Sequence, residues 1–352
     1  MDLEAKKKAF VALGDFLRQF ATNEFVKSEK VEHNDAFFSS FEALIETSVH
    51  YNGWFVKEQV LLAVQSWADA LTEENIAQWC SAYDFSREPL KKVGLILAGN
   101  IPLVGFHDLL SVLISGNIAL VKLSSNDQKL LPFLAKYLQT VEPQFQDRLI
   151  FIDGKMEGFD AVIATGSNNT ARYFDYYFNS VPHVIRKNRN SVALLTGEET
   201  PEQLVELGKD IFTFYGLGCR NVSKLFVPRD YNFDAFFQGM YEQRDVIEYE
   251  RYANNYDYNK AVFLMSEFKL LDNGFLTIKE DASYASPISS IYYEYYDAID
   301  EVVERLRKDE DKIQCIVSNE LTEDSIAFGQ TQHPQLWDYA DQVDTLEFLL
   351  KL

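Results

Sequence analysis

One cysteine of the sequence has the setting of a catalytic nucleophile. Cys219 lies in the segment FYGLGCR (residues 214–220), after two glycines and directly before Arg220. Such a turn exposes a thiol, and a neighbouring guanidinium lowers its pKa and favours the reactive thiolate. The alternative role is structural, which suits Cys315 within an apolar run and Cys80 in a predicted helix. We therefore predict that Cys219 is the nucleophile.

An asparagine follows the first predicted strand. The segment AGNIP (residues 98–102) places Asn100 where the strand turns into a helix. A side-chain amide at the carboxyl end of a strand can donate a hydrogen bond to a developing oxyanion. An asparagine at this position also caps a helix, and on this motif alone capping is the simpler interpretation.

Two further strand ends carry groups suited to a nucleotide, although no GxGxxG motif follows the first strand. The segment KLSS (122–125) offers an ammonium and two hydroxyls for a ribose or a phosphate, or else an ordinary surface lysine. The segment TGS (165–167) precedes a helix, where glycine admits a ligand close to the backbone and the helix N-terminus favours an anion. A plain strand-to-helix turn would have a similar sequence.

The elements that must position these residues change character along the chain. Residues 1–90 have apolar residues at helical spacing. After them, short apolar runs predict strands, and helical segments alternate with these runs. The strands are expected at 93–98, 118–123, 149–152, 161–164 and 192–195, and the helices near 102–115, 127–140, 168–180 and 201–217. This alternation predicts an α/β fold with a parallel sheet covered on both faces.

A second set of elements begins near residue 223. Strands are expected at 223–227, 275–279, 288–295 and 313–318, with a helix near 298–308. The tyrosine-rich stretches 249–258 and 292–296 suggest either the lining of an apolar substrate channel or ordinary packing and surface strand positions. No low-complexity linker separates the two sets.

Composition excludes several functional classes. The 352 residues carry 33 Lys and Arg against 54 Asp and Glu, a net charge of −21. Such a field repels nucleic acid and anionic membranes, so neither is an expected partner. Three separated cysteines and no HExxH motif indicate reduced thiols, a cytoplasmic location and no metal site. No signal peptide is expected at the amino terminus, and the apolar stretch 93–122 is interrupted by glycines and Asp108.

These motifs, in this order and spacing, resemble the aldehyde dehydrogenase superfamily, and most of all the fatty-acyl-CoA reductases of bacterial luminescence operons. The resemblance implies a doubly wound parallel-sheet cofactor domain, a second α/β catalytic domain and a homodimer or higher homo-oligomer. It also implies an oxyanion hole made by Asn100 and the backbone N–H of Cys219. Lys122 would contact the adenosine ribose, and the helix after Ser167 would lie beside the pyrophosphate. The candidate cofactor-binding residues are Gly99, Lys122, Ser124, Ser125, Thr165, Gly166 and Ser167.

Departures from the family pattern refine the expected reaction. Aligning Ser191 with the serine of the family's Glu-Leu-Gly-Gly-Lys-Ser-Pro segment puts Arg186 where aldehyde-oxidising members have the glutamate that activates water. Ser125 replaces the glutamate with which NAD-preferring members contact the ribose, so we predict NADPH. The family's Glu-x-Phe-Gly-Pro segment has a weak counterpart in SYASP (283–287), without the glutamate.

A basic cluster interrupts the acidic sequence at residues 183–189, which include His183, Arg186, Lys187 and Arg189. We expect Arg186 and Arg189 to bind a phosphate of CoA or of the cofactor. Ion pairing with the many carboxylates is an equally good explanation of the cluster.

The resemblance predicts four parts: a helical part of the cofactor domain (1–90), a dinucleotide-binding domain (91–205), a catalytic cysteine domain (206–320) and a C-terminal segment (321–352) that returns to the cofactor domain or to an oligomer interface. The predicted reaction is the NADPH-dependent reduction of a long-chain fatty acyl-CoA to an aldehyde through a thioacyl-enzyme on Cys219. The alternatives are an acyl-phosphate reductase of the glutamyl phosphate reductase type, and a non-enzymatic protein that binds acyl-CoA or a nucleotide.

Overall fold

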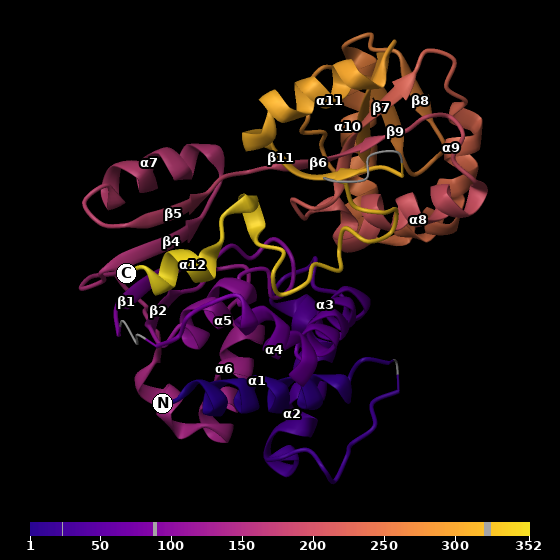
Figure 1. Ribbon diagram of the computed structural model, residues 1–352. Helices are drawn as coiled ribbons and strands as arrows, with labels where there is room; N and C mark the ends of the chain where they lie inside the picture. Colours follow the sequence, from indigo (N-terminus) through magenta and orange to yellow (C-terminus); the bar gives the residue numbers. More distant parts are fainter. Residues whose placement is uncertain (23, 87–89, 320–324) are drawn as a thin grey trace. The chain divides into compact units, whose positions relative to one another are not determined.

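The computed structural model describes residues 1–22, 24–86, 90–319 and 325–352 (Figure 1). The chain divides into two compact units, each treated separately below. Unit 1 contains Met1–Lys187 and Gln335–Leu352, and unit 2 contains Asn188–Pro334. No helix of the described ranges is both long and apolar enough to cross a membrane.

The amino-terminal part of unit 1 is helical, as its apolar spacing predicted. Asp2 caps the first helix by accepting a hydrogen bond from the Ala5 N–H, and Thr72 caps the fourth in the same way through the Asn75 N–H. The helices are α1 (Leu3–Arg18), α2 (Asn34–Thr47), α3 (Lys57–Ala70) and α4 (Glu73–Ser81).

The sheet of unit 1 is parallel throughout and has the strand order β3-β2-β1-β4-β5. The chain therefore runs outward from β1 to β3 and then returns to the other side of β1 to form β4. This reversal makes the space between the carboxyl ends of β1 and β4 a topological switch point, where open α/β sheets bind ligands. The strands are β1 (Lys92–Ile96), β2 (Ile118–Lys122), β3 (Leu149–Phe151), β4 (Ala161–Thr165) and β5 (His183–Arg186), and the connecting helices are α5 (Phe106–Ile114), α6 (Leu130–Val141) and α7 (Asn168–Phe178).

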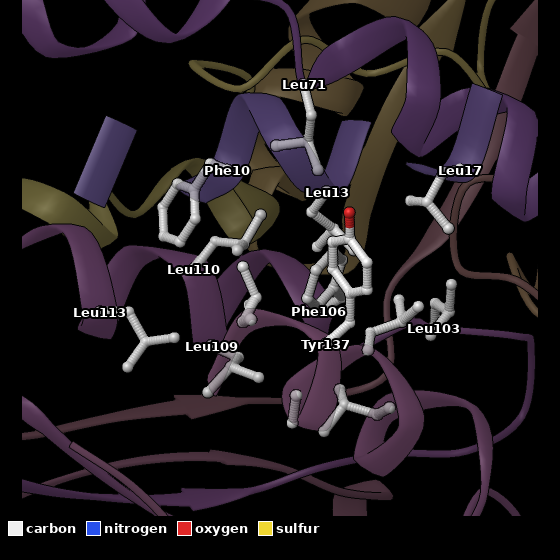
Figure 2. Close-up of a cluster of buried hydrophobic side chains, with 14 of the residues drawn as sticks. Phe10, Leu13, Leu17, Leu71, Leu103, Phe106, Leu109, Leu110, Leu113 and Tyr137 are labelled. Carbon is white, nitrogen blue, oxygen red and sulfur yellow. The ribbon is translucent and has the colours of Figure 1, made fainter. Parts of the chain in front are cut away.

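A large apolar core joins the amino-terminal helices of unit 1 to its sheet. Figure 2 shows α1 presenting one apolar face, with Phe10, Leu13 and Leu17, toward side chains of α5 and Tyr137 of α6. All of these side chains are buried. The amino-terminal helices thus help to fix α5, the helix that follows the turn containing Asn100.

The C-terminal segment 335–352 packs against the amino-terminal helices within unit 1. The Tyr339 hydroxyl accepts a hydrogen bond from Trp79 Nε1 at 2.7 Å, and Tyr83 donates to Asp344 Oδ2 at 2.7 Å. The segment ends in α12 (Thr345–Leu350), whose Leu346 side chain is fully buried.

The sheet of unit 2 has the order β11-β6-β7-β10-β9-β8 and is parallel except for the pairing of β8 with β9. Its strands are β6 (Asn190–Leu194), β7 (Val222–Pro228), β8 (Leu270–Asp272), β9 (Thr277–Glu280), β10 (Ser290–Tyr296) and β11 (Ile313–Val317). Its helices are α8 (Pro201–Phe212), α9 (Phe233–Met240), α10 (Glu250–Met265) and α11 (Ile299–Lys308). Two parallel sheets with covering helices confirm the predicted fold class.

The boundaries between the two units differ from the predicted domain boundaries. The first change of unit falls at 187/188 rather than 205/206, because β6 pairs with β7 and β11 of the second sheet. The second falls at 334/335, whereas the predicted boundary 320/321 lies outside the described residues. Strands β5 and β8 were not predicted, and the stretch 249–258 forms part of a helix rather than a strand.

Candidate functional site

The topology of unit 1 brings its predicted site residues together at the carboxyl ends of the parallel strands, which form one edge of the sheet. Asn100 follows β1, Ser124 follows β2, and Gly166 follows β4. These three strands are neighbours, with Ile96 in register with both Lys122 and Ala164. The edge includes the switch point, so the sequence motifs that were separate along the chain lie at the ligand-binding end of a doubly wound sheet.

The turns after β1 and β2 are packed closely together. A Cβ atom on Gly99 would lie 2.8 Å from Ser124 Cβ and Oγ, and only 3.0 Å from the Asp127 nitrogen. Asn52 joins the same turns, because its Nδ2 donates to the carbonyl oxygens of Gly99 at 3.4 Å and Asn126 at 3.1 Å. Asn52 lies outside the strand-end motifs, so the sequence gives no signal for its role.

A buried carboxyl group lies beneath the turn that carries Asn100. Asp127 is 7% exposed, and its Oδ2 accepts a hydrogen bond from the Leu103 N–H at 3.4 Å. Burial raises the pKa of Asp127 to about 6, although backbone N–H donors oppose this rise. Asp127 thus couples the turn after β1 to the turn after β2.

The carboxyl end of β2 carries the ammonium and hydroxyl groups that the sequence predicted for a nucleotide site. Lys122 is half-buried, and its Nζ donates to the Gly154 carbonyl oxygen at 3.1 Å. Ser124 is half-buried and accepts a hydrogen bond from the Asn126 N–H, whereas Ser125 is exposed. An ammonium held by a carbonyl, beside a hydroxyl open to solvent, suits a ribose or phosphate ligand.

The turn after β4 leads directly into the capped N-terminus of α7, where an anion would be expected to bind. Ser167 is the N-cap residue, and its Oγ accepts a hydrogen bond from the Thr170 N–H at 3.3 Å. The Gly166 N–H donates to the Arg186 carbonyl oxygen at 3.1 Å, which fixes the turn to the end of β5. A Cβ atom on Gly166 would lie 3.0 Å from Phe174 Cε2, so glycine is needed for close packing.

Arg186 does not face solvent as a phosphate-binding residue would. It is 5% exposed and donates to both carboxylate oxygens of Asp108, at 2.7 and 3.1 Å. The prediction that Arg186 binds a phosphate therefore lacks structural support, because a buried carboxylate already neutralises its charge. In unit 2, Arg189 donates to the carbonyl oxygens of Glu310 and Ile313.

In unit 2, Cys219 is exposed on a turn at the amino end of β7. Asn221 organises this turn from beneath: it is 3% exposed, its Oδ1 accepts the Gly218 N–H at 2.8 Å, and its Nδ2 donates to the Asp210 and Thr213 carbonyl oxygens. The Ser191 hydroxyl donates to the Cys219 carbonyl oxygen at 2.9 Å. An accessible thiol on a rigid backbone is the arrangement that a nucleophile requires.

The backbone before Cys219 is strained. Phe214 and Tyr215 adopt left-handed conformations with φ of 53° and 56°, and Gly216 follows with φ of 75°. Each left-handed non-glycine residue costs roughly 1–2 kcal/mol. Tyr215 is held by stacking on Tyr249, with ring centroids 4.9 Å apart. Strain of this kind is concentrated at functional sites, where the surrounding packing maintains it.

Arg220 contacts a part of unit 2 distant in sequence. Its Nη1 donates to Cys315 Sγ at 3.5 Å and to the Thr331 carbonyl oxygen at 3.3 Å. The backbone N–H of Thr331 in turn donates to the buried Asp210 carboxylate at 3.0 Å. These contacts give Arg220 a role in packing the segment around residue 331 beside the cysteine turn.

A small hollow, open to solvent, lies beside the cysteine turn within unit 2. Tyr215 and Gly216 from the strained segment line it, together with Ser223, Tyr252 and Pro287. Tyr252 comes from the first tyrosine-rich stretch, for which a channel lining was one of the two predicted roles. Most of its ring is packed in the core, since Tyr252 is 1% exposed.

Residues 80–235 match the family model described as Acyl-CoA reductase (LuxC). No curated protein sequence matches the chain. The family match includes the turns after β1, β2 and β4 as well as Cys219.

Solved structures of aldehyde dehydrogenases resemble the chain over most of its length. Aldehyde dehydrogenase 21 from Physcomitrella patens, solved with the product succinate, is 12% identical, with a TM-score of 0.64 over 99% of this chain and 87% of that one. The Bacillus cereus enzyme, solved with NAD+, is 13% identical, with a TM-score of 0.62 over 90% and 72%. A putative enzyme from Burkholderia cenocepacia is 13% identical, with a TM-score of 0.59 over 86% and 74%. The shared fold and the family match confirm the resemblance found in the sequence.

Proposed function

From the aldehyde dehydrogenase fold of this chain and the match of its residues 80–235 to the acyl-CoA reductase family, we propose that the protein is an NADPH-dependent acyl-CoA reductase. The observation that carries the proposal is the exposed thiol of Cys219 on a turn that Asn221 and Ser191 hold rigid. The match to a reductase family directs the proposal toward thioester reduction rather than aldehyde oxidation.

The edge of the unit 1 sheet has the donors that a nicotinamide dinucleotide needs. The Lys122 ammonium and the Ser125 hydroxyl suit the adenosine ribose and its 2′-phosphate, and the first turn of α7 suits the pyrophosphate. Gly99 and Thr165 complete the predicted set at the same edge. When bound, the cofactor would supply the hydride.

Cys219 carries the covalent chemistry in the proposed reaction. Its thiolate attacks the thioester carbonyl carbon, CoA leaves as a thiolate that takes up a proton from solvent, and an acyl group remains on the Cys219 sulfur. The backbone N–H of Cys219 would donate a hydrogen bond to the oxyanion. After hydride addition to the acyl carbon, the carbon–sulfur bond breaks, which releases the aldehyde and restores the Cys219 thiolate.

Arg186 supports reduction over hydrolysis. With Ser191 aligned on the serine of the family's Glu-Leu-Gly-Gly-Lys-Ser-Pro segment, Arg186 stands where that segment has its glutamate. In the structure it is a buried cation paired with Asp108. A guanidinium cannot accept a proton from water, so it offers no general base for hydrolysis of the thioacyl-enzyme.

A steady-state assay tests the proposal. Purified protein with a series of acyl-CoA chain lengths and NADPH should consume NADPH and release CoA in equal amounts. The variant Cys219→Ala should lose at least about 10³-fold in rate because the covalent route is removed. The variant Cys80→Ala, at a buried cysteine of unit 1, is the matched control and should keep its activity.

The other outcomes identify the rival functions. Turnover with an acyl phosphate but with no acyl-CoA would indicate an acyl-phosphate reductase. Binding of CoA or nucleotide without turnover of either substrate would indicate a binding protein. A fully active Cys219→Ala variant would refute the covalent mechanism.

Cofactor choice is tested at Ser125. We expect a higher kcat/KM with NADPH than with NADH, because no carboxylate at position 125 repels a 2′-phosphate. Ser125→Glu should lower kcat/KM for NADPH by about tenfold or more through like-charge repulsion and favour NADH. Ser125→Gln is the uncharged control, and equal losses in the two variants would contradict the charge argument.

We also propose that the protein acts in the cytoplasm as a homo-oligomer. Three tyrosines on α7, Tyr173, Tyr176 and Tyr177, are 65%, 74% and 68% exposed in the single chain. Exposed aromatic side chains gathered on one helix favour a subunit interface. Sedimentation equilibrium would test this, and a monomer at micromolar concentration would contradict it.

A further inference from the structure

The buried side chain of Arg186 links three segments of unit 1 that are far apart in sequence. Its Nε and Nη2 donate to the two carboxylate oxygens of Asp108, in the first turn of α5. Its Nη1 donates to the Ala340 carbonyl oxygen at 2.7 Å, and its Nη2 also donates to Thr345 Oγ1 at 2.8 Å. The guanidinium therefore connects β5 both to α5 and to the C-terminal segment.

The backbone of the same residue contacts the candidate pyrophosphate turn. Arg186 is the last residue of β5 and lies in register with Thr165, the last residue of β4. Its carbonyl oxygen accepts the Gly166 N–H at 3.1 Å. Any displacement of the Arg186 backbone would thus be transmitted by one hydrogen bond to the turn that begins α7.

The buried ion pair between Arg186 and Asp108 tolerates few substitutions of the arginine. Arg186 and Asp108 are 5% and 6% exposed, and a second carboxylate lies near the pair, with Asp341 Oδ2 3.9 Å from Arg186 Nη1. Loss of the guanidinium would therefore leave the buried Asp108 carboxylate without its counter-charge. The planar guanidinium pairs with the carboxylate through two parallel hydrogen bonds and still reaches two further acceptors. A lysine at this position would keep the charge but could not reproduce this set of contacts.

We propose that Arg186 is a positioning residue for the cofactor site: it holds the Gly166–Ser167 turn in place by anchoring the end of β5 to Asp108 and to the C-terminal segment. The C-terminal residues Ala340 and Thr345 thereby contribute to cofactor binding without touching the cofactor. This inference rests on the proposed function, because it assigns the turn to the pyrophosphate of a nicotinamide dinucleotide.

Two measurements on purified full-length variants test the proposal. The first is the Kd of NADPH, followed by its fluorescence. The second is hydrogen exchange of the amides of residues 165–171 without any cofactor. Arg186→Met should weaken NADPH binding by about tenfold or more and speed exchange at the Gly166 amide, and Arg186→Lys should lie between it and the wild type.

A mild variant and a matched arginine make the test decisive. Thr345→Val removes, at a fully buried position, the hydroxyl that accepts from Arg186 Nη2 and donates to the Val343 carbonyl oxygen. It should weaken NADPH binding about two- to threefold while the protein stays folded. Arg148, whose Nη1 donates to the Gly116 carbonyl oxygen, is the control within unit 1. Arg148→Met should lower the melting temperature without changing the Kd of NADPH or the exchange at Gly166.

The rate of acylation distinguishes a positioning role of Arg186 from a general loss of folded structure. Release of CoA on mixing with acyl-CoA alone should change by less than about threefold in Arg186→Met, because Cys219 belongs to unit 2. A Kd and an exchange rate in Arg186→Met and Thr345→Val equal to those of the wild type would overturn the inference and leave the proposed function intact. A wild-type protein that binds neither NADPH nor NADH would overturn both.

Discussion

The two units position their candidate residues by different means. In unit 1 the residues lie at the ends of neighbouring parallel strands, where strand order alone brings them together. In unit 2 the Cys219 turn depends on specific side chains, above all Asn221 and Ser191, and on a left-handed backbone at residues 214–216. The comparison teaches that topology suffices to gather ligand-binding groups, whereas presenting a nucleophile requires dedicated contacts.

The sharpest test of this difference is Asn221→Ala. The change removes one acceptor and several donor contacts beneath the Cys219 turn and leaves buried backbone groups unsatisfied. We expect a loss of about 3 kcal/mol in the free energy of unfolding and a large loss of activity. Asn255→Ala removes an exposed hydrogen bond from Asn255 Nδ2 to the Arg251 carbonyl oxygen and should stay within about 0.5 kcal/mol of the wild type.

Unfolding in denaturant and CoA release give the two readouts. An Asn221→Ala protein with wild-type rates of acylation would show that the Cys219 turn does not depend on the hydrogen bonds of Asn221.

A second test addresses the close packing of the turns in unit 1. Gly99→Ala places a methyl group 2.8 Å from Ser124 and against the Asp127 nitrogen, so the two turns must separate. We expect a cost of about 2 kcal/mol and weaker NADPH binding. Gly154→Ala, which meets nothing within 4 Å, is the control. Equal melting temperatures for the two variants would contradict the packing argument.

The buried Asp127 predicts a pH dependence for unit 1. Its pKa is raised from 3.8 to about 6 in the folded protein by burial. The folded state therefore holds the proton more tightly, and this contribution to stability is complete below pH 3.8 and is lost as pH rises through 6. The expected loss is about 2 kcal/mol between these limits.

Comparing the wild type with Asp127→Asn across this pH range isolates the contribution from that of other carboxylates. The difference in the free energy of unfolding between the two proteins should fall as pH rises. A constant difference would mean that Asp127 ionises with an ordinary pKa.

The smallest expected effect comes from comparing two glycines of unit 2, which distinguishes the cost of backbone strain from an effect on acylation. Gly216 and Gly274 both have left-handed φ, of 75° and 93°, so alanine at either position should cost about 1 kcal/mol of stability. Only Gly216 lies beside the Cys219 turn, so only Gly216→Ala should also slow acylation. Equal acylation rates in the two variants would remove the functional role of the left-handed segment.

Much of unit 1 could be predicted from its sequence because the signals are local. Apolar runs bounded by glycine and asparagine mark β1, β2 and β4, and the polar residues directly after them are the candidate site. The parallel order of these strands then follows from their alternation with helices. The fold class and the family resemblance were predicted for this reason.

The environment of Arg186 could not be predicted in the same way. Its partners Asp108, Ala340 and Thr345 are 78, 154 and 159 residues away in sequence. In a basic stretch the residue resembled a surface cation, and β5 itself was missed because histidine and arginine weaken its apolar pattern. Asn221 was overlooked for a related reason, since its partners become visible only once α8 and the Cys219 turn are folded together.

The most direct test of the account is to trap the acyl-enzyme. Protein mixed with acyl-CoA in the absence of NADPH should gain the mass of one acyl group, located on Cys219 by peptide mapping, and subsequent NADPH should discharge it as the aldehyde. Cys219→Ser should give no thioester under the same conditions. An acyl group found on Cys80 or Cys315, or its release as the free acid when NADPH is added, would contradict the account.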